Sequence, residues 1–167
     1  LQNIHKSFGN NHVLKGVNIN VDEGKSLVII GGSGTGKSII LKCILGLEKT
    51  DQGQILLHGK DINRTNRENF FARFGMLFQG GALFDSLTVW ENVAFKMLRG
   101  KLKKTNAEAR NIAIEKLRHV GLKPEVADKY PAELSGGMQK RVSLARAIAA
   151  NPEIIFFDEP NTGLDPI

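Results

Sequence analysis

A glycine-rich octapeptide at residues 31–38 constrains the fold of this chain more than any other feature. It reads Gly31, Gly32, Ser33, Gly34, Thr35, Gly36, Lys37 and Ser38, which is the pattern GxxxxGK followed by Ser or Thr. An apolar run at residues 27–30 precedes it, and helical spacing follows over residues 39–45. We expect the run to be a strand covered on both faces. The order of strand, glycine turn and helix predicts an α/β fold with a phosphate-binding loop.

The residue types in this loop suit a polyphosphate. Residues without a Cβ let backbone N–H groups turn inward around phosphate oxygens, and the following helix adds its positive N-terminal end. We expect Lys37 to reach the β- and γ-phosphates and to assist catalysis, and the Ser38 hydroxyl to bind Mg²⁺. ATP and Mg²⁺ are therefore the predicted cofactors.

A second candidate site lies at two adjacent carboxylates that follow an apolar run at residues 154–157. Asp158 can hold Mg²⁺, as an aspartate does at this place in other phosphate-loop enzymes. Strand side chains alternate, so Glu159 is expected to point to the opposite side and to act as the general base for an attacking water.

A second predicted helix start, at residues 134–139, also favours an anion. Ser135 is a good N-cap residue, and Gly136 and Gly137 leave the N–H groups of the first turn uncovered. One nucleotide has no evident use for two such sites on one chain.

The order and spacing of these motifs resemble the nucleotide-binding domain of ABC transporters. Residues 134–138 look like the LSGGQ signature, with Met138 in place of glutamine. The resemblance implies that Ser135, Gly136 and Gly137 bind ATP held by a second copy of the domain, in a head-to-tail pair. It also implies that Phe8 stacks on adenine, and that Gln79 contacts Mg²⁺ and the attacking water. Residues 161–165 match the D-loop of the family, with Asn161 and Thr162 departing from its commonest form.

The resemblance and the hydrophobic pattern together give the expected organisation. We expect a phosphate-loop NTPase (RecA-like) core at residues 1–79 and 151–167, with antiparallel strands at residues 1–8 and 17–21. The ABC α-helical subdomain is expected as an insert at residues 80–150. The further expected strands cover residues 54–57, 76–78 and 154–157, and the further helices cover 66–71, 88–98, 106–120 and 137–150.

Residues 1–167 are thus expected to be one ABC ATPase domain that lacks its C-terminal part, because the family's switch histidine follows the D-loop. We therefore expect weak or no ATP hydrolysis from these residues alone.

A finer resemblance concerns the ATPase of bacterial Mla-type phospholipid transporters. Residues 80–95, 134–138 and 163–167 carry it, and residues 81–84 and Met138 are its discriminating features. It implies a membrane permease, docked near Ala82 to Trp90, and a lipid-binding MCE protein as partners. The alternatives are the ATPase of a polar-solute importer, such as one for amino acids, and a soluble protein with two fused ABC domains. A chromosome-maintenance ATPase is disfavoured, because residues 79–135 have no room for a long coiled coil.

Composition restricts the cellular setting. No apolar stretch is long enough to span a bilayer, and no secretion signal opens the chain. The lone Cys43 is expected to be a small apolar residue on a helix. The net charge of +6 is scattered, apart from a cluster at residues 99–104, so we expect no nucleic-acid partner. The resemblance implies a peripheral position on the cytoplasmic face of the inner membrane.

Overall fold

The computed structural model describes residues 1–64, 70, 72–77, 81–99 and 103–158. The chain divides into two compact units, Leu1–Phe71 and Ala72–Ile167. The phosphate loop belongs to the first unit, and Asp158 and the signature belong to the second. No helix among the described residues is long and apolar enough to cross a membrane.

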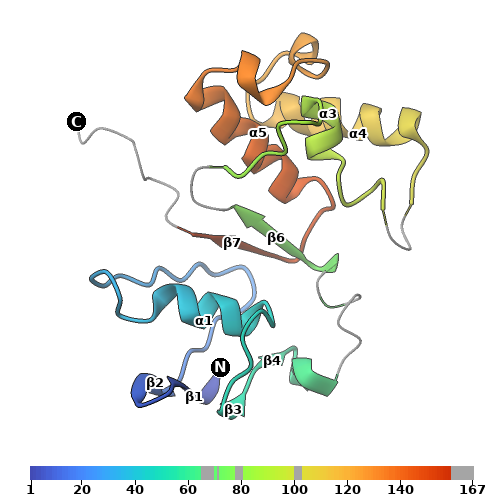
Figure 1. Ribbon diagram of the computed structural model, residues 1–167. Helices are drawn as coiled ribbons and strands as arrows, with labels where there is room; N and C mark the ends of the chain where they lie inside the picture. The colour runs from blue at the N-terminus through green and yellow to red at the C-terminus, as the bar shows by residue number, and fades with distance from the viewer. Residues whose placement is uncertain (65–69, 71, 78–80, 100–102, 159–167) are drawn as a thin grey trace. The chain divides into compact units, whose positions relative to one another are not determined.

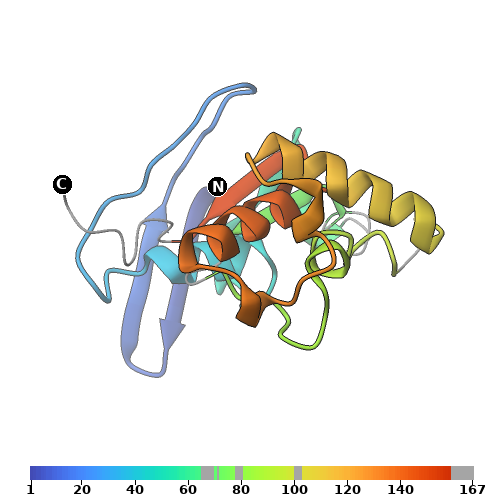
Figure 2. The same ribbon diagram turned by 90° about the horizontal axis from the view of Figure 1, so that it is seen from above.

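The first unit contains an antiparallel sheet with strand order β2-β1-β3 (Figures 1 and 2). Its strands are β1 (Gln2–Phe8), β2 (Asn11–Val17) and β3 (Gln52–Gln54). Gly9, with φ 57°, makes the turn between β1 and β2 and lets Phe8 pair with Asn11. The N-terminal antiparallel pair is as expected, but the prediction of the second strand at residues 17–21 was wrong, because the tight turn starts the pairing at Asn11.

The helix after the phosphate loop, α1 (Lys37–Ile44), packs in the first unit. Its Ile40 and Cys43 are buried together with Ile4 and Leu14 of the sheet. The expected strand at residues 27–30 is not formed: no helix or strand is assigned over residues 18–36, and Ile30 is 90% exposed. An apolar run becomes a covered strand only with ladder partners on its edges.

The rest of the first unit is a short hairpin, β4 (Leu56–Leu57) with β5 (Lys60–Asp61), and a 3₁₀ turn, η1 (Ile62–Arg64). The expected strand at residues 54–57 is divided between β3 and β4, because Ile55 turns into the core between them. The helix expected at residues 66–71 lies outside the described residues, except for Phe70.

The second unit is built on two parallel strands, β6 (Phe74–Leu77) and β7 (Ile154–Phe157), paired in register from Phe74–Ile154 to Leu77–Phe157. The connection between them carries α3 (Val89–Val93), α4 (Asn106–His119) and α5 (Gly136–Ile148). Two 3₁₀ turns, η2 (Pro124–Val126) and η3 (Pro131–Glu133), separate α4 from α5. A parallel pair joined by helices confirms the expected α/β class.

The three helices of this connection share one hydrophobic core. In Figure 1 they form a group, and Figure 2 shows α4 (yellow) beside α5 (orange to red). Val89, Val93, Leu117 and Val142 are almost completely buried between them. Helix α4 keeps its expected length, whereas the helix expected at residues 88–98 ends at Val93 and continues as turns.

Candidate functional site

The phosphate loop enters α1 through glycines with left-handed backbone. Gly34 has φ 78°, and Gly36, the N-cap residue of α1, has φ 96°. A Cβ added at Gly36 would lie 3.1 Å from side-chain carbons of both Val13 and Leu14. The backbone angle therefore favours glycine at this position, and a side chain would also crowd Val13 and Leu14 of β2.

The lysine and the threonine of the loop hold it in a closed turn. The Lys37 ammonium donates hydrogen bonds to the carbonyl oxygens of Gly31 at 2.6 Å and Gly32 at 2.7 Å. The Thr35 hydroxyl donates to the Gly32 oxygen at 2.8 Å. The ammonium of Lys37 thus lies against the backbone of the predicted phosphate-binding loop.

The start of α1 has the properties of an anion site. No side chain caps the helix, and its first turn contains no acidic residue, so free N–H donors and the positive helix end remain available. A Cβ at Gly34 would meet nothing within 4 Å, and Ser38 is exposed in the first turn. With Lys37 beside them, these groups fit a nucleoside triphosphate.

The predicted adenine platform is Phe8, the last residue of β1, and its side chain is 44% exposed. The Lys6 ammonium lies 5.0 Å from the centroid of the Phe8 ring. An exposed aromatic residue in the same unit as the phosphate loop is suited to stack on a base.

Asp158 lies directly after β7, where its backbone N–H donates to the Leu77 oxygen at 3.0 Å and extends the parallel ladder by one residue. The residue is half-buried. Among the residues that the structure describes, no group of three His, Cys, Asp or Glu residues forms a metal centre. A single carboxylate such as Asp158 fits Mg²⁺, which typically takes one or two protein carboxylates and completes its shell with phosphates and water.

The signature residues form the start of α5 as expected. Ser135 is its N-cap residue, with an extended backbone, and its hydroxyl accepts a hydrogen bond from the Met138 N–H at 3.3 Å. Gly136 and Gly137 are exposed, and a Cβ at either would meet nothing within 4 Å. The N-terminus of α5 is therefore open on its glycine side, as binding of an external phosphate requires.

The methionine of the signature has a structural role. Met138 packs against the helical core together with Leu134, which is 7% exposed. The next residue, Gln139, donates to the oxygens of Pro131 at 2.8 Å and Leu134 at 3.4 Å. These contacts fix the loop that leads into Ser135.

Two α5 residues that sequence reasoning missed hold the segment that follows Gln79. The buried Ser143 hydroxyl donates to the Gly81 oxygen at 2.8 Å. Arg146 donates to the oxygens of Gly81 at 2.8 Å and Ala82 at 2.9 Å. Burial lowers the pKa of the Arg146 guanidinium, a sign of how far the group is removed from water. No local sequence signal marks these contacts, because the partners lie more than 60 positions apart.

The segment at residues 82–90 is the predicted permease-docking region. Leu83 and Trp90 pack against the helical core, whereas Phe84 is 43% exposed. The Phe84 ring stacks on Phe95 with 4.5 Å between centroids, and the Arg99 guanidinium lies 3.8 Å from the Phe95 centroid. Phe84 is thus the more exposed of the two aromatic residues of this segment, since Trp90 is half-buried.

Three predicted parts of the site lie outside the described residues: Gln79, Glu159 and residues 161–165. Their assigned roles stay predictions. Leu77 and Phe157, which lie two residues before Gln79 and Glu159, are described and are paired at the ends of β6 and β7.

Known proteins resemble this chain in both sequence and fold. The sequence profile of the ABC transporter family matches residues 14–162. The chain is 43% identical to the probable ribonucleotide transport ATP-binding protein mkl of Mycobacterium leprae, over all of this chain and 48% of that protein. It is 42% identical to protein trigalactosyldiacylglycerol 3 of Arabidopsis thaliana, over 99% of this chain and 50% of that protein. The chain therefore spans about half the length of these two relatives.

A shorter relative and a solved structure are matched over more of their length. The chain is 40% identical to the glutamine transport ATP-binding protein GlnQ of Bacillus subtilis, over 99% of this chain and 68% of that protein. The dimeric bacterial ABC transporter cassette MJ0796 superposes with a TM-score of 0.83 and 34% identity, over 98% of this chain and 75% of that one. The same cassette has been solved in a post-hydrolysis state with ADP and phosphate. This chain belongs to the ABC transporter family of ATP-binding cassettes.

Proposed function

We propose that this protein binds and hydrolyses ATP to drive transport through a membrane permease. The observation that carries the proposal is the uncapped start of α1, with Lys37 held 2.6 Å from the Gly31 oxygen. A helix end with free donors, a glycine turn and a lysine together favour a triphosphate.

Each site residue has a defined part in the reaction. Lys37 moves from the loop carbonyls to the β- and γ-phosphates. Glu159 accepts the proton of a water whose oxygen attacks the γ-phosphorus, while the bond from that phosphorus to the β–γ bridging oxygen breaks and ADP leaves with the electron pair. Gln79 orients that water. Ser38 and Asp158 hold magnesium, which when bound offsets the charge of the phosphates.

ATPase assays on the full-length protein test these roles. Glu159→Gln should keep ATP binding and lose turnover by about 10²- to 10⁴-fold, the usual share of a general base. Lys37→Ala should weaken ATP binding itself, because it removes a charge-assisted contact to phosphate. Unchanged turnover in Glu159→Gln would remove Glu159 from the role of base.

A second copy of the chain completes the site in this proposal. The open start of α5, with Ser135, Gly136 and Gly137, has no phosphate of its own and binds the ATP held by the partner. Dimerisation should therefore need ATP and be strengthened by Glu159→Gln, which prevents breakdown of the bridging ligand. Light scattering with and without ATP measures this, and equal dimer populations in both conditions would contradict it.

The permease partner places the protein on the cytoplasmic face of the inner membrane as a peripheral subunit. Phe84 supports docking near Ala82 to Trp90, because exposed aromatic residues commonly anchor protein interfaces. The surface around Phe84 also carries Arg99, which adds a positive charge at its edge.

Phospholipid is the substrate class that we propose, with a lipid-binding MCE protein as a further component. Residues 81–84 and Met138 support it, as does a relative named after a diacylglycerol lipid. The second candidate is a polar solute, favoured by the relatives named for ribonucleotide and glutamine transport. Reconstitution of the full-length protein with its permease in liposomes separates them: labelled phospholipid transfer that needs ATP supports the first, and uptake of glutamine or ribonucleotide supports the second.

A further inference from the structure

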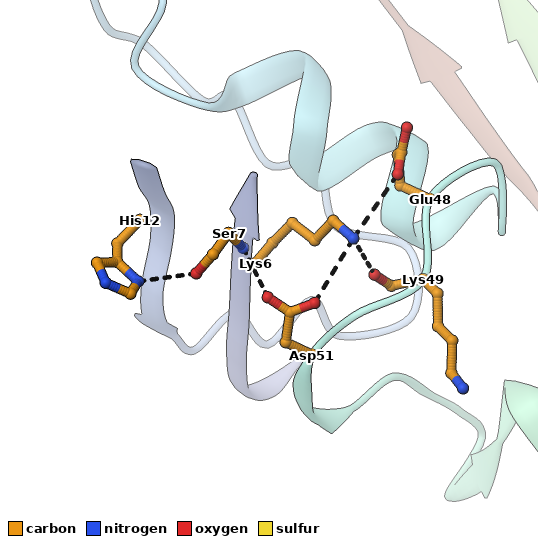
Figure 3. A network of polar contacts seen from close by, with 6 residues as sticks. All are labelled: Lys6, Ser7, His12, Glu48, Lys49 and Asp51. Carbon is orange, nitrogen blue, oxygen red and sulfur yellow. Dashed lines mark hydrogen bonds and ion pairs between the residues drawn. The ribbon is translucent and has the colours of Figure 1, made fainter. Parts of the chain in front are cut away.

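A lysine next to the predicted adenine platform joins two parts of the first unit. Lys6 lies on β1 and its side chain is only 12% exposed (Figure 3). Its ammonium donates to the Lys49 oxygen at 2.8 Å and lies 3.7 Å from a Glu48 carboxylate oxygen and 3.6 Å from one of Asp51. Lys6 thus connects the sheet to the segment that follows α1. We call these contacts the Lys6 brace.

The Lys6 ammonium also contacts the aromatic ring of Phe8. The same ammonium lies 5.0 Å from the centroid of Phe8, within the range of a cation–π contact. Asp51 also accepts a hydrogen bond from the Ser7 N–H at 2.6 Å, and its own N–H donates to the His5 oxygen at 2.9 Å. The residue before Phe8 is therefore fixed by the carboxylate that lies beside Lys6.

The β1–β2 hairpin is held at the same point. The Ser7 hydroxyl and His12 Nδ1 are hydrogen-bonded at 2.8 Å, across the pair that Ser7 and His12 form in the ladder (Figure 3). Phe8 and Asn11 are the next pair, at the tip of the hairpin. The ring of Phe8 is exposed, but the backbone that carries it is constrained on both sides.

The other end of the Lys6 brace is tied to the phosphate loop through one helix. The N–H groups of Leu47 and Glu48 both donate to the Lys42 oxygen, at 2.9 and 3.2 Å, so Glu48 is attached to the last turn of α1. Helix α1 has eight residues and begins at Lys37 of the phosphate loop, so it is about 12 Å long. One short, rigid element therefore separates the phosphate end from the Lys6 brace.

We propose that Lys6 is a positioning residue for the nucleobase: it holds the Phe8 ring at a fixed place relative to α1, so that base and triphosphate are bound together. The proposal rests on the ATP-binding function proposed above and adds a determinant of base recognition. The ligand class is a nucleoside triphosphate whose base stacks on Phe8. Lys6 acts through Phe8 and touches neither phosphate nor base.

The test compares ATP with inorganic tripolyphosphate, which has the phosphates without the base. Affinities for both ligands, and KM and kcat for ATP, are measured on the full-length protein and on Lys6→Met, Phe8→Ala and the double variant. Lys6→Met should weaken ATP binding about three- to tenfold, the range of a cation–π contact and a loosened ring, with tripolyphosphate affinity and kcat unchanged. In the Phe8→Ala background Lys6→Met should have no further effect, because its action depends on the ring.

Two further variants serve as controls. Lys6→Arg keeps a cation over the ring and should retain most ATP affinity. Lys15→Met removes an exposed lysine from the neighbouring strand and should change nothing. If Lys6→Met does not fold, Asp51→Asn weakens the Lys6 brace from its other end and should give the same selective loss of ATP affinity.

The outcomes separate this proposal from the function beneath it. If the wild type binds ATP no better than tripolyphosphate, or if Phe8→Ala leaves ATP affinity unchanged, the base does not stack on Phe8. The positioning role of Lys6 is then refuted as well. If Phe8→Ala weakens ATP binding but Lys6→Met does not, only the positioning role is refuted. Equal losses for ATP and tripolyphosphate, or additive losses in the double variant, would show that Lys6 merely supports the fold and would also overturn the proposal.

Discussion

Replacement of Asn92 by alanine tests whether one buried amide holds the segment that we propose as the docking region. Asn92 lies in α3 and is fully buried. Its Oδ1 accepts from the Phe84 N–H at 2.8 Å. Its Nδ2, whose two hydrogens are shared among three acceptors, lies within hydrogen-bond distance of the oxygens of Phe84 at 3.0 Å, Leu87 at 3.1 Å and Thr88 at 3.0 Å. The side chain therefore closes the loop between residues 84 and 88.

The expected loss in the free energy of unfolding depends on which backbone groups keep another hydrogen-bond partner in Asn92→Ala. The Phe84 oxygen still accepts from the Leu87 N–H, and the Thr88 oxygen from the Asn92 N–H, so neither becomes unsatisfied in Asn92→Ala. The Phe84 N–H and the Leu87 oxygen lose the bond to Asn92. At about 1–3 kcal/mol for each group left unpaired, less about 0.5 kcal/mol gained from the helix propensity of alanine, the expected loss is about 3 kcal/mol.

Urea unfolding of the full-length protein measures this loss. With a slope of about 2 kcal/mol per molar urea, the midpoint should fall by about 1.5 M. Asn111→Ala, at an exposed position of α4, is the matched control and should shift the midpoint little. A shift for Asn92→Ala as small as that of the control would refute the reasoning, because the amide would then have no measurable hold on the loop.

Three further predictions concern other parts of the chain. Phe84→Glu should reduce co-purification with the permease while leaving ATP affinity unchanged, whereas Trp90→Glu should destabilise the helical core. If Phe84→Glu lost both permease co-purification and ATP affinity, the result would count against docking. Cys43 is 3% exposed and burial raises its thiol pKa, so a thiol reagent at pH 7.5 should react slowly with the native protein and quickly in urea; equal rates would contradict this. Hydrogen bonds from the Thr105 backbone and side chain lower the pKa of Glu108. The ionised Glu108 carboxylate therefore stabilises the fold above the ordinary carboxyl pKa, and this stabilisation is lost as the pH falls through the lowered pKa. Glu108→Gln should flatten the pH dependence of the free energy of unfolding in that acid range.

Elements with strong local signals were predicted well from the sequence. Helix α4 begins after Thr105, whose hydroxyl and backbone N–H form a capping box with Glu108, and Gly121 follows its end with φ 73°. Helix α5 likewise begins at the expected serine and glycines. These boundaries depend on residues within one turn of each other, so the sequence alone contains the information.

Elements whose formation depends on distant partners were predicted poorly. The run at residues 27–30 has the composition of a covered strand but is not assigned as one, because composition does not specify a ladder partner. Strand β2 was misplaced, because only Leu14 of its seven residues is buried and the apolar pattern is weak. The contacts of Lys6 with Lys49 and of Arg146 with Gly81 join residues 43 and 65 positions apart, and no spacing rule predicts such pairs.

The contacts of α5 connect the segment that follows Gln79, a residue proposed to act at the nucleotide, with the helix that begins at the signature. Gly81 lies two residues after Gln79, and a Cβ on it would come within 2.7 Å of the Ser143 hydroxyl, so loop and helix are in direct contact. Ser143 and Arg146 bind the Gly81 oxygen from the helix whose first turn follows Ser135. A displacement of Gly81 would therefore either break these two hydrogen bonds, whose donors are buried or half-buried, or carry α5 with it. Both responses are costly, because unpaired buried groups are unfavourable and because Val142 and Ala145 of α5 are fully buried in the helical core. We therefore expect Gly81 and the first turn of α5 to keep a fixed distance from each other.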